Sequence, residues 1–342
     1  MSTPAPEHGD FAALIVAWQR RHGRHDLPWQ GTRDPYRVWL SEIMLQQTQV
    51  ATVIPYYQRF LARFPDIPAL AAAAPDAVMA LWSGLGYYAR ARNLHRCAQV
   101  LLAEHGGRFP GEAAAIAELP GIGRSTAAAI AAFAFGRRGA ILDGNVKRVL
   151  TRVFGIEGFP GKPAVERELW ALAESLLPAD DIEAYTQGIM DLGATLCTRS
   201  RPDCAACPMR GICVAERDGR QAALPTAKPA KAVPQKEAHY CLFTDGKRVL
   251  LERRPPQGIW GGLLALPEGE PEILAARLGL KLLQQETMSP LQHAFTHFRL
   301  TLRATRCRVE PSPVCAEKDH VWLPLQDAAD AGLPAPMKKL LT

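Results

Sequence analysis

A cluster of cysteines late in the chain limits the possible folds more than any other feature of the sequence. The spacing is Cys-x6-Cys-x2-Cys-x5-Cys, formed by Cys197, Cys204, Cys207 and Cys213. Four thiolates in so short a loop can hold one iron–sulfur cluster or one tetrahedral metal ion. A zinc site usually has two close cysteine pairs, and here only Cys204 and Cys207 form one. The spacing therefore favours one 4Fe-4S cluster, with zinc or a disulfide pair as the alternatives.

The remaining cysteines show no partner spacing, and we interpret them as reduced thiols: Cys97, Cys241, Cys307 and Cys315. The early apolar run 11–18 does not resemble a secretory signal, because Glu7 and Asp10 precede it and no Lys or Arg does. We therefore expect a reducing, intracellular compartment, the cytoplasm.

Length and charge set broad limits on the domains and the partners. With 342 residues and 48% hydrophobic content, the chain has room for two cores. It has no apolar stretch of membrane-spanning length, so we expect no membrane partner. The net charge of +6 permits a polyanionic partner. Residues 197–236 carry eight Lys or Arg against three acids, and Arg199 and Arg201 lie between the first two cluster cysteines, where they could contact phosphates.

The composition changes after Arg217, and this change predicts two domains. Residues 218–236 contain three prolines and many small residues without helical or strand periodicity, which is typical of an extended linker. Upstream, apolar residues recur at helical spacing. Downstream, alternation at 239–243 and 298–304 predicts strands, with a helix near 272–278. We expect an all-α domain over 1–217 and an α+β domain over 237–342.

A glycine-containing turn near the middle of the first domain predicts a helical hairpin over 113–134. Leu119-Pro120-Gly121-Ile122-Gly123 is followed by Arg124-Ser125-Thr126 and an alanine-rich helix. Glycines let the backbone approach a ligand closely, and the helix start offers free N–H groups to a phosphate. Alone, the segment favours a plain helix-turn-helix corner. Together with the cysteines, it indicates helix-hairpin-helix DNA binding through Gly121, Gly123 and Arg124.

Two carboxylates are candidate catalytic groups. Asp34 and Pro35 predict a helix start, so Glu42 lies two turns into that helix, among Trp39, Ile43 and Leu45. Apolar neighbours would raise its pKa and suit it to act as a general acid, but this segment alone favours a solvated helix glutamate. Asp143 precedes an apolar-periodic run and is a typical N-cap, which helix N–H groups would keep ionised. Such a pair matches the arrangement that cleaves glycosidic bonds.

These motifs resemble the endonuclease III superfamily of DNA glycosylases. Within it, WLSEIMLQQTQV, GLGYYARARNLH, LPGIGRSTAAAI and ILDGNVKRVL are similar to the adenine DNA glycosylase (MutY) family over nearly the whole chain. The resemblance implies a monomer that binds double-stranded DNA. It also implies that the enzyme flips out and removes adenine mispaired with 8-oxoguanine or guanine, leaving an abasic site.

The resemblance also implies residue roles. Glu42 matches the acid that protonates adenine N7, Asp143 the group that stabilises or captures the sugar cation, and Asn145 their support. The implied adenine pocket comprises Trp29, Gln30, Leu45, Gln47, Thr48, Ser125 and Gln187. Implied DNA contacts are Gln46, Gln49, Tyr87, Gly121, Gly123, Arg124, Lys147, Arg199 and Arg201. Of these, Tyr87 matches an aromatic wedge. The alternative role, a core aromatic at a helix start, would suit Tyr88 equally well, so the choice of Tyr87 rests on the resemblance.

Ser125 decides between two classes of glycosylase. Relatives that also nick DNA place there a lysine that forms a Schiff base, which a hydroxyl cannot do. The sequence therefore predicts a monofunctional enzyme. Two alternatives remain: a thymine-glycol or mismatch glycosylase with lyase activity, and a non-enzymatic cluster-bearing DNA binder that has no use for Glu42 and Asp143 together.

The C-terminal domain resembles the Nudix fold through residues 253–263 and Leu266-Pro267. The clustered glutamates of active Nudix hydrolases are missing, since 269–280 offers only Glu270 and Glu272. The resemblance implies that this domain recognises 8-oxoguanine through a Phe-Ser-His loop. The matching residues are Phe295, Thr296 and His297, with threonine in place of serine.

Overall fold

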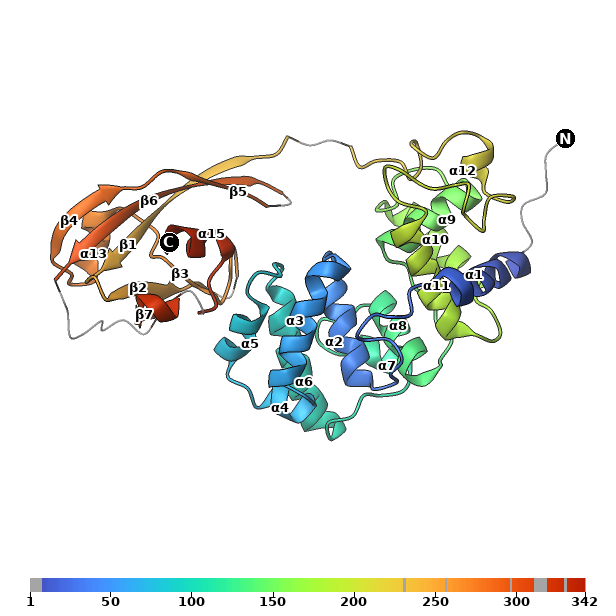
Figure 1. The fold of residues 1–342 in the computed structure, drawn as a ribbon, viewed down its shortest axis with the longest axis horizontal. Coiled ribbons are helices and arrows are strands. Elements are labelled where there is room, and N and C mark those ends of the chain that lie inside the picture. The colour runs from blue at the N-terminus through green and yellow to red at the C-terminus, as the bar shows by residue number, and fades with distance from the viewer. Residues whose placement is uncertain are drawn as a thin grey trace. The chain divides into compact units, whose positions relative to one another are not determined.

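The computed structural model describes residues 8–229, 232–255, 257–295, 297–310, 319–328 and 331–341. Its contacts divide the chain into two compact units (Figure 1). The first, the helical unit, comprises 1–71 and 96–230. The second, the sheet unit, comprises 72–95 and 231–342.

The helical unit contains most of the helices. They are α1 (His8–His22), α2 (Pro35–Leu45), α3 (Val50–Arg63), α4 (Ile67–Ala71), α7 (Ala113–Ala117), α8 (Arg124–Phe135), α9 (Gly144–Phe154), α10 (Pro163–Ser175), α11 (Ile182–Thr195) and α12 (Val214–Arg217). A further helix, α6 (Ala89–His105), begins in the sheet unit and ends in the helical unit.

The helix starts that matter for the site form where the sequence predicts them. The carboxylate of Asp34 accepts a hydrogen bond from the Tyr36 N–H at 3.0 Å, and Pro35 occupies the first helical position of α2. Asp143 caps α9 by accepting from the Val146 N–H at 2.8 Å. Each cap satisfies an N–H group that the helix leaves without a partner. Both N-cap predictions are confirmed.

One hydrophobic core joins α1, α8, α9 and α11. Phe11 and Ile15 of α1 are fully buried against residues such as Val149 of α9 and Leu192 of α11. Because α1 and α11 share this core, the loop that follows α1 is held beside α11. That packing positions the pocket described below.

The sheet unit is built on one mixed, 7-stranded sheet. Its strands follow the order β3-β2-β1-β6-β4, with β5 paired to β6 and β7 paired to β2. Among the strands that the structure describes, only β1 and β6 pair in parallel, in a register that sets Cys241 opposite Thr305. The strands are β1 (Gln235–Thr244), β2 (Arg248–Arg253), β3 (Leu264–Ala265), β4 (Leu282–Thr287), β5 (Leu291–Ala294), β6 (Arg299–Val309) and β7 (His320–Pro324).

Short helices complete this unit: α5 (Pro75–Trp82), α13 (Pro271–Arg277), α14 (Leu325–Ala328) and α15 (Ala335–Leu341). Leu274 and Leu278 of the α13 segment pack on Phe243 and Leu250 of the sheet. Asp76 of α5 pairs with both terminal nitrogens of Arg253 at 2.7 Å, which ties α5 to β2. The predicted strands at 239–243 and 298–304 and the predicted helix near 272–278 are confirmed, and so is the fold class.

The first half of the segment 218–236 differs from the extended linker that the sequence predicts. Leu224 is buried, its carbonyl accepts a hydrogen bond from Arg152 at 2.8 Å, and Thr226 accepts one from the Gly158 N–H at 3.2 Å. This part therefore packs on the helical unit, because an apolar side chain and a buried guanidinium hold it there. At the other end, β1 already begins at Gln235. The domain boundaries drawn from the sequence stay predictions.

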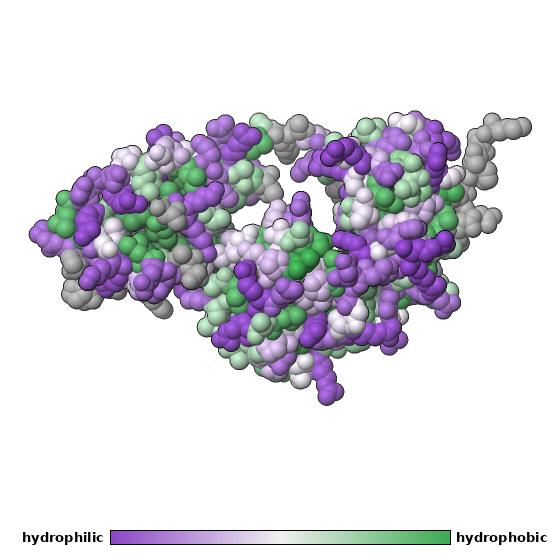
Figure 2. All heavy atoms as spheres, in the orientation of Figure 1, coloured by the Kyte–Doolittle hydropathy of each residue, from purple (hydrophilic) through white to green (hydrophobic). Residues whose placement is uncertain are grey.

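Hydrophilic residues cover most of the face drawn in Figure 2. Among the helices that the structure describes, none combines the length and the apolar character needed to cross a membrane.

Candidate active site

The helical unit contains a pocket of about 860 Å³ between α2, the start of α11 and the loop after α1. Of the residues predicted from the sequence, Trp29, Gln30, Glu42 and Gln187 line it. They come from the α1–α2 loop, α2 and α11, which are far apart in the chain. The pocket is wide enough for a purine and combines an acidic group with amide groups.

Glu42 has the electrostatics expected of a proton donor. Burial raises its pKa from 4.5 to about 7, and the negative charge of Asp143 adds to the rise. A carboxyl with such a pKa keeps its proton for much of the time at neutral pH and can still release it. The structure therefore favours the general-acid interpretation over a solvated helix glutamate.

Asp143 is under two opposing influences. Burial raises the pKa of this carboxyl, while the N–H groups of Val146 and Asn145, the charge of Arg148 and the Asn145 amide lower it. The net shift is upward. The helix N–H groups, from which the sequence predicted an ionised carboxylate, are thus opposed by burial. The carboxylate is thus held by several donors in a position that is costly for a charge.

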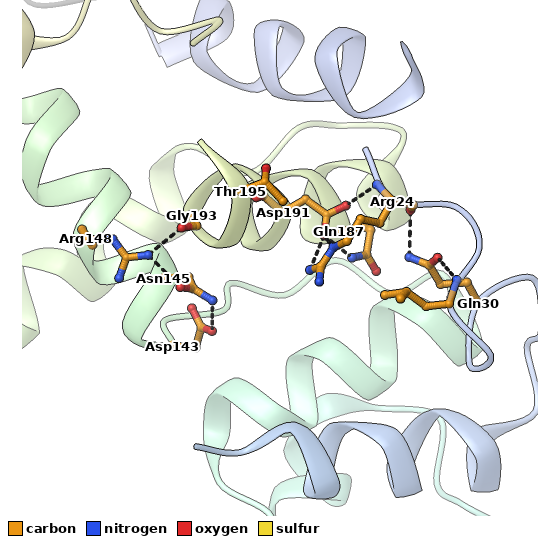
Figure 3. Close-up of polar contacts among 10 residues, drawn as sticks. Arg24, Gln30, Asp143, Asn145, Arg148, Gln187, Asp191, Gly193 and Thr195 are labelled. Carbon is orange, nitrogen blue, oxygen red and sulfur yellow. Dashed lines mark hydrogen bonds and ion pairs between the residues drawn. The ribbon is translucent and has the colours of Figure 1, made fainter. Parts of the chain in front are cut away.

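Asn145 and Arg148 link Asp143 to Gly193 of α11 (Figure 3) and also to the cysteine loop. The Asn145 amide nitrogen lies 3.5 Å from an Asp143 oxygen, and its own oxygen accepts from Arg148 at 2.8 Å. Arg148 also donates to the carbonyls of Gly193 and Cys197, at 2.6 and 2.7 Å. Asn145 was predicted as a supporting residue. Arg148 was missed, although its position three residues after Asn145 places both on one face of α9.

The predicted hairpin is present as α7, a turn and α8. Gly121 has φ +78, which favours glycine. Gly123 is the N-cap of α8 and has no side chain that could accept a hydrogen bond from the first N–H groups of the helix. The Ser125 hydroxyl accepts from the Leu142 N–H at 2.9 Å, next to Asp143. The Arg124 guanidinium already has partners within the protein. It pairs with Glu174 and lies over the Trp170 ring, 3.9 Å from the ring centre. A DNA phosphate would share this guanidinium with Glu174 or compete with it.

Several predicted pocket or DNA residues lie outside the pocket lining. Leu45 ends α2, and the loop after it carries Gln46, whose amide donates to the Thr126 hydroxyl at 3.3 Å. Gln47 is exposed with φ 56, the Thr48 hydroxyl donates to the Gln46 carbonyl, and Gln49 caps α3. These residues form one stretch beside the hairpin helix. Their roles stay predictions.

Two further predicted DNA contacts have different surroundings. Lys147 forms an ion pair with Glu166 at 2.5 Å. Tyr87 belongs to the sheet unit, has φ 48 and exposes 41% of its surface, whereas Tyr88 is half-buried. An exposed ring on a strained backbone suits insertion better than a half-buried one. The structure thus favours Tyr87 over Tyr88, and its role stays a prediction.

The four clustered cysteines all line one small cavity beside α9 and α11. Arg152 donates to the Cys197 sulfur at 3.4 Å and Gln221 to the Cys204 sulfur at 3.8 Å. Burial raises the pKa of Cys207 to about 12 and raises that of Cys213, which favours neutral thiols. A bound cation would shift both toward the thiolate form. Each of the four is a free thiol. Across the described ranges, no three His, Cys, Asp or Glu side chains are arranged to hold a single metal ion.

The predicted recognition loop is the turn between β5 and β6. Phe295 stacks on Phe298 with ring centres 4.4 Å apart, and the exposed His297 lies edge-on to Phe298 at 4.8 Å. The Phe295 N–H donates to the Phe298 carbonyl, which closes the turn. Thr296 lies outside the described residues. The described residues of this segment belong to a loop, as the resemblance implied, and not to a strand.

Comparison with known proteins identifies the family. Residues 40–175 match the HhH-GPD superfamily of base excision DNA repair proteins, and 239–342 match the NUDIX domain. The chain is 36% identical to the adenine DNA glycosylase of Buchnera aphidicola subsp. Acyrthosiphon pisum (strain APS), over 97% of this chain and 96% of that protein. It is 33% identical to the adenine DNA glycosylase of Mus musculus, over 96% of this chain and 77% of that protein. The chain belongs to the adenine DNA glycosylase family.

Solved structures agree with this family at the level of the fold. A thermostable thymine-DNA glycosylase matches with a TM-score of 0.54 and 30% identity, over 61% of this chain and 95% of its own. An endonuclease III in a non-covalent DNA complex matches with a TM-score of 0.53 at 20% identity, over 61% and 94%. The resemblance inferred from the sequence motifs is confirmed for an adenine DNA glycosylase with a helix-hairpin-helix domain and a Nudix-like domain.

Proposed function

We propose that this protein removes adenine mispaired with 8-oxoguanine or guanine from duplex DNA and leaves an abasic site. The observation that carries the proposal is Glu42 in the pocket wall, whose carboxyl has a pKa of about 7. Asp143, the N-cap of α9, is close enough for its negative charge to raise that pKa. Family membership supports adenine as the base. It also supports a role in DNA repair. We further propose that the protein acts as a monomer in the cytoplasm.

The chemistry follows from the two carboxyl groups. Glu42 donates its proton to N7 of the flipped adenine, so the base leaves as a neutral molecule when the bond between N9 and the sugar breaks. The sugar becomes an oxocarbenium-like cation. The Asp143 carboxylate stabilises it on one face. Water then adds to the sugar carbon and gives its proton to the Glu42 carboxylate, which restores the acid. Asn145 and Arg148 hold Asp143 in place.

Duplex binding is assigned to backbone and basic groups. The uncapped N–H groups after Gly123 suit one phosphate, and the exposed Arg199 and Arg201 suit others. No ion pair to either arginine is recorded within the described parts of the chain. Tyr87 fits the gap left by the flipped base.

Cys197, Cys204, Cys207 and Cys213 would hold one 4Fe-4S cluster. Four sulfurs around one cavity, with Arg152 and Gln221 donating to two of them, fit an anionic thiolate group. When bound, the cluster supplies structural cross-linking of the loop and no bond breaking. Holding this loop keeps Arg199 and Arg201 in register with the backbone of the DNA.

Strand cleavage is not part of the proposed activity. The hydroxyl of Ser125 is engaged with the Leu142 N–H and offers no amine for a Schiff base. We assign reading of the opposite 8-oxoguanine to the loop of Phe295 and His297, whose stacked ring and exposed imidazole suit contact with an oxidised purine.

A single-turnover assay tests the proposal. Duplexes with adenine opposite 8-oxoguanine, adenine opposite guanine and thymine opposite guanine are incubated with excess enzyme, and alkali then reveals abasic sites. We expect release of adenine, fastest opposite 8-oxoguanine, and no strand breaks before alkali. Release of thymine with breaks before alkali would favour the mismatch glycosylase with lyase activity, and binding without release would favour the non-enzymatic DNA binder.

A further inference from the structure

A buried ion pair joins the loop after α1 to α11 at the back of the pocket. Asp191 of α11 is fully buried, and one of its oxygens accepts from Arg24 Nε at 2.7 Å and the terminal NH2 at 2.6 Å. Its other oxygen accepts from the Arg24 backbone N–H at 2.9 Å. A buried charge is stable only when such donors surround it. The pair therefore fixes both the side chain and the backbone of Arg24.

The same carboxylate fixes a pocket residue. Gln187 lies one helical turn before Asp191, and its amide nitrogen donates to the Asp191 carboxylate at 2.9 Å (Figure 3). A carboxylate accepts hydrogen bonds only, so the nitrogen of this amide must be the atom that faces Asp191. The amide oxygen is then left for the pocket that Gln187 lines. Within the described residues, no hydrogen bond to that oxygen is recorded.

Arg24 also fixes the side chain of Gln30, which lines another wall of the pocket. Its carbonyl accepts from the Gln30 amide at 2.9 Å, and the Gln30 oxygen accepts from the Leu27 N–H at 3.1 Å. Trp29 and Gln30 belong to this loop and line the pocket. One buried carboxylate thus orders residues on two walls.

We propose that Asp191, paired with Arg24, is a positioning residue that sets base specificity by orienting the Gln187 amide with its oxygen toward the base. This inference rests on the proposed function. An inward oxygen accepts from the 6-amino group of adenine and gains nothing from a purine that lacks that group. Asp191 itself does not touch the substrate.

Asp191→Asn in the full-length protein is the direct test. Gln187 and the Arg24 guanidinium donate to the same Asp191 oxygen, and the other oxygen accepts from the Arg24 backbone N–H. In the variant, an NH2 group replaces one of these oxygens and faces either the backbone N–H or both the guanidinium and Gln187, which are donors. Either arrangement weakens the anchor of Gln187, so its NH2 group is no longer kept away from the 6-amino group of adenine. We compare single-turnover release of adenine and of unsubstituted purine, each placed opposite 8-oxoguanine. Loss of one polar contact predicts a roughly tenfold fall for adenine with little change for purine.

A second variant covers the case in which Asp191→Asn does not fold. Arg24→Met combined with Asp191→Leu removes both charges and leaves no unpaired buried ion, which such cores tolerate. Gln187 then loses its anchor, and the ratio of adenine to purine release should fall in the same direction. Arg20→Gln is the matched control, because it breaks the exposed Arg20–Asp181 pair between α1 and α11 and should leave both rates unchanged.

The outcomes separate the inference from the proposed function. A ratio within about twofold of wild type in a variant that folds would overturn the inference, and so would an equal fall for both bases, which indicates structural damage alone. If the wild-type protein releases neither base from any duplex, the proposed function fails instead. A selective loss of adenine release in either variant supports the positioning role.

Discussion

Replacing Glu42 with glutamine should raise the stability of the protein while it removes activity. Burial raises the pKa of this carboxyl from 4.5 to about 7, which corresponds to roughly 3 kcal/mol for holding its ionised form in the fold. Between these two pKa values, the folded protein binds a proton that the unfolded chain has released. Stability therefore falls as the pH rises through this window, and the full cost is present above about 7.

Glutamine has nearly the same shape and carries no charge at any pH. Glu42→Gln should therefore match wild type at about pH 5 and exceed its free energy of unfolding by up to roughly 3 kcal/mol at about pH 8. Urea titrations of the full-length protein at both pH values measure this difference. Single-turnover adenine release should fall by about 100-fold, because a general acid is lost. In wild type, the same rate should fall above the Glu42 pKa of about 7.

Glu104→Gln is the control, because Glu104 is exposed on α6. This variant should have the same free energy of unfolding as wild type at both pH values and the same rate of adenine release. If Glu42→Gln is no more stable than wild type at the higher pH, Glu42 is not held protonated by its surroundings. Near-normal adenine release would remove this residue from the mechanism whatever its pKa.

Three other predictions concern lyase activity, the cluster and the sheet unit. Borohydride should trap almost no covalent complex between the wild-type protein and a nicked or abasic duplex, and efficient trapping would contradict the monofunctional assignment. The purified protein should be yellow-brown and contain iron, and Cys204→Ser should lose both and bind duplex DNA weakly; zinc without iron would refute the cluster. His297→Ala should reduce the preference for adenine opposite 8-oxoguanine over adenine opposite guanine by about tenfold, while Gln292→Ala on β5 should not; equal preferences in all three proteins would exclude the loop as the reader.

Local rules in the sequence predicted much of the frame. Asp34, Pro35 and Asp143 mark helix starts through contacts within three residues, and such contacts leave a visible pattern. The hairpin at Gly121 follows from the same kind of local constraint. Alternating side chains gave the strands of the sheet unit, because each strand has faces of different burial.

Long-range packing could not be predicted in the same way. Arg24 and Asp191 are 167 residues apart, and Arg124 pairs with Glu174 across 50 residues. No residue close in sequence to Arg24 or Arg124 indicates which acid each of them pairs with. One signal was available for Asp191: it follows Gln187 by one turn among Ile189 and Leu192, and an acid in such apolar company needs buried donors. The packing of Leu224 on the helical unit likewise depends on Arg152, a distant residue.

Burial alone does not separate the proposed roles of Glu42 and Asp143, because it raises the pKa of both carboxyls. The difference comes from the backbone: Asp143 caps α9 and receives N–H groups and the charge of Arg148, whereas Glu42 lies within α2, where the helix uses its own N–H groups. Asp143→Asn tests this division, since asparagine keeps the cap and loses the charge. Adenine release should fall by about 100-fold with the fold intact. Because the Asp143 charge also raises the Glu42 pKa, the stability loss between about pH 5 and 8 should become smaller in this variant. An unchanged pH dependence would mean that the two carboxyls do not interact, and the acid would then owe its proton to burial alone.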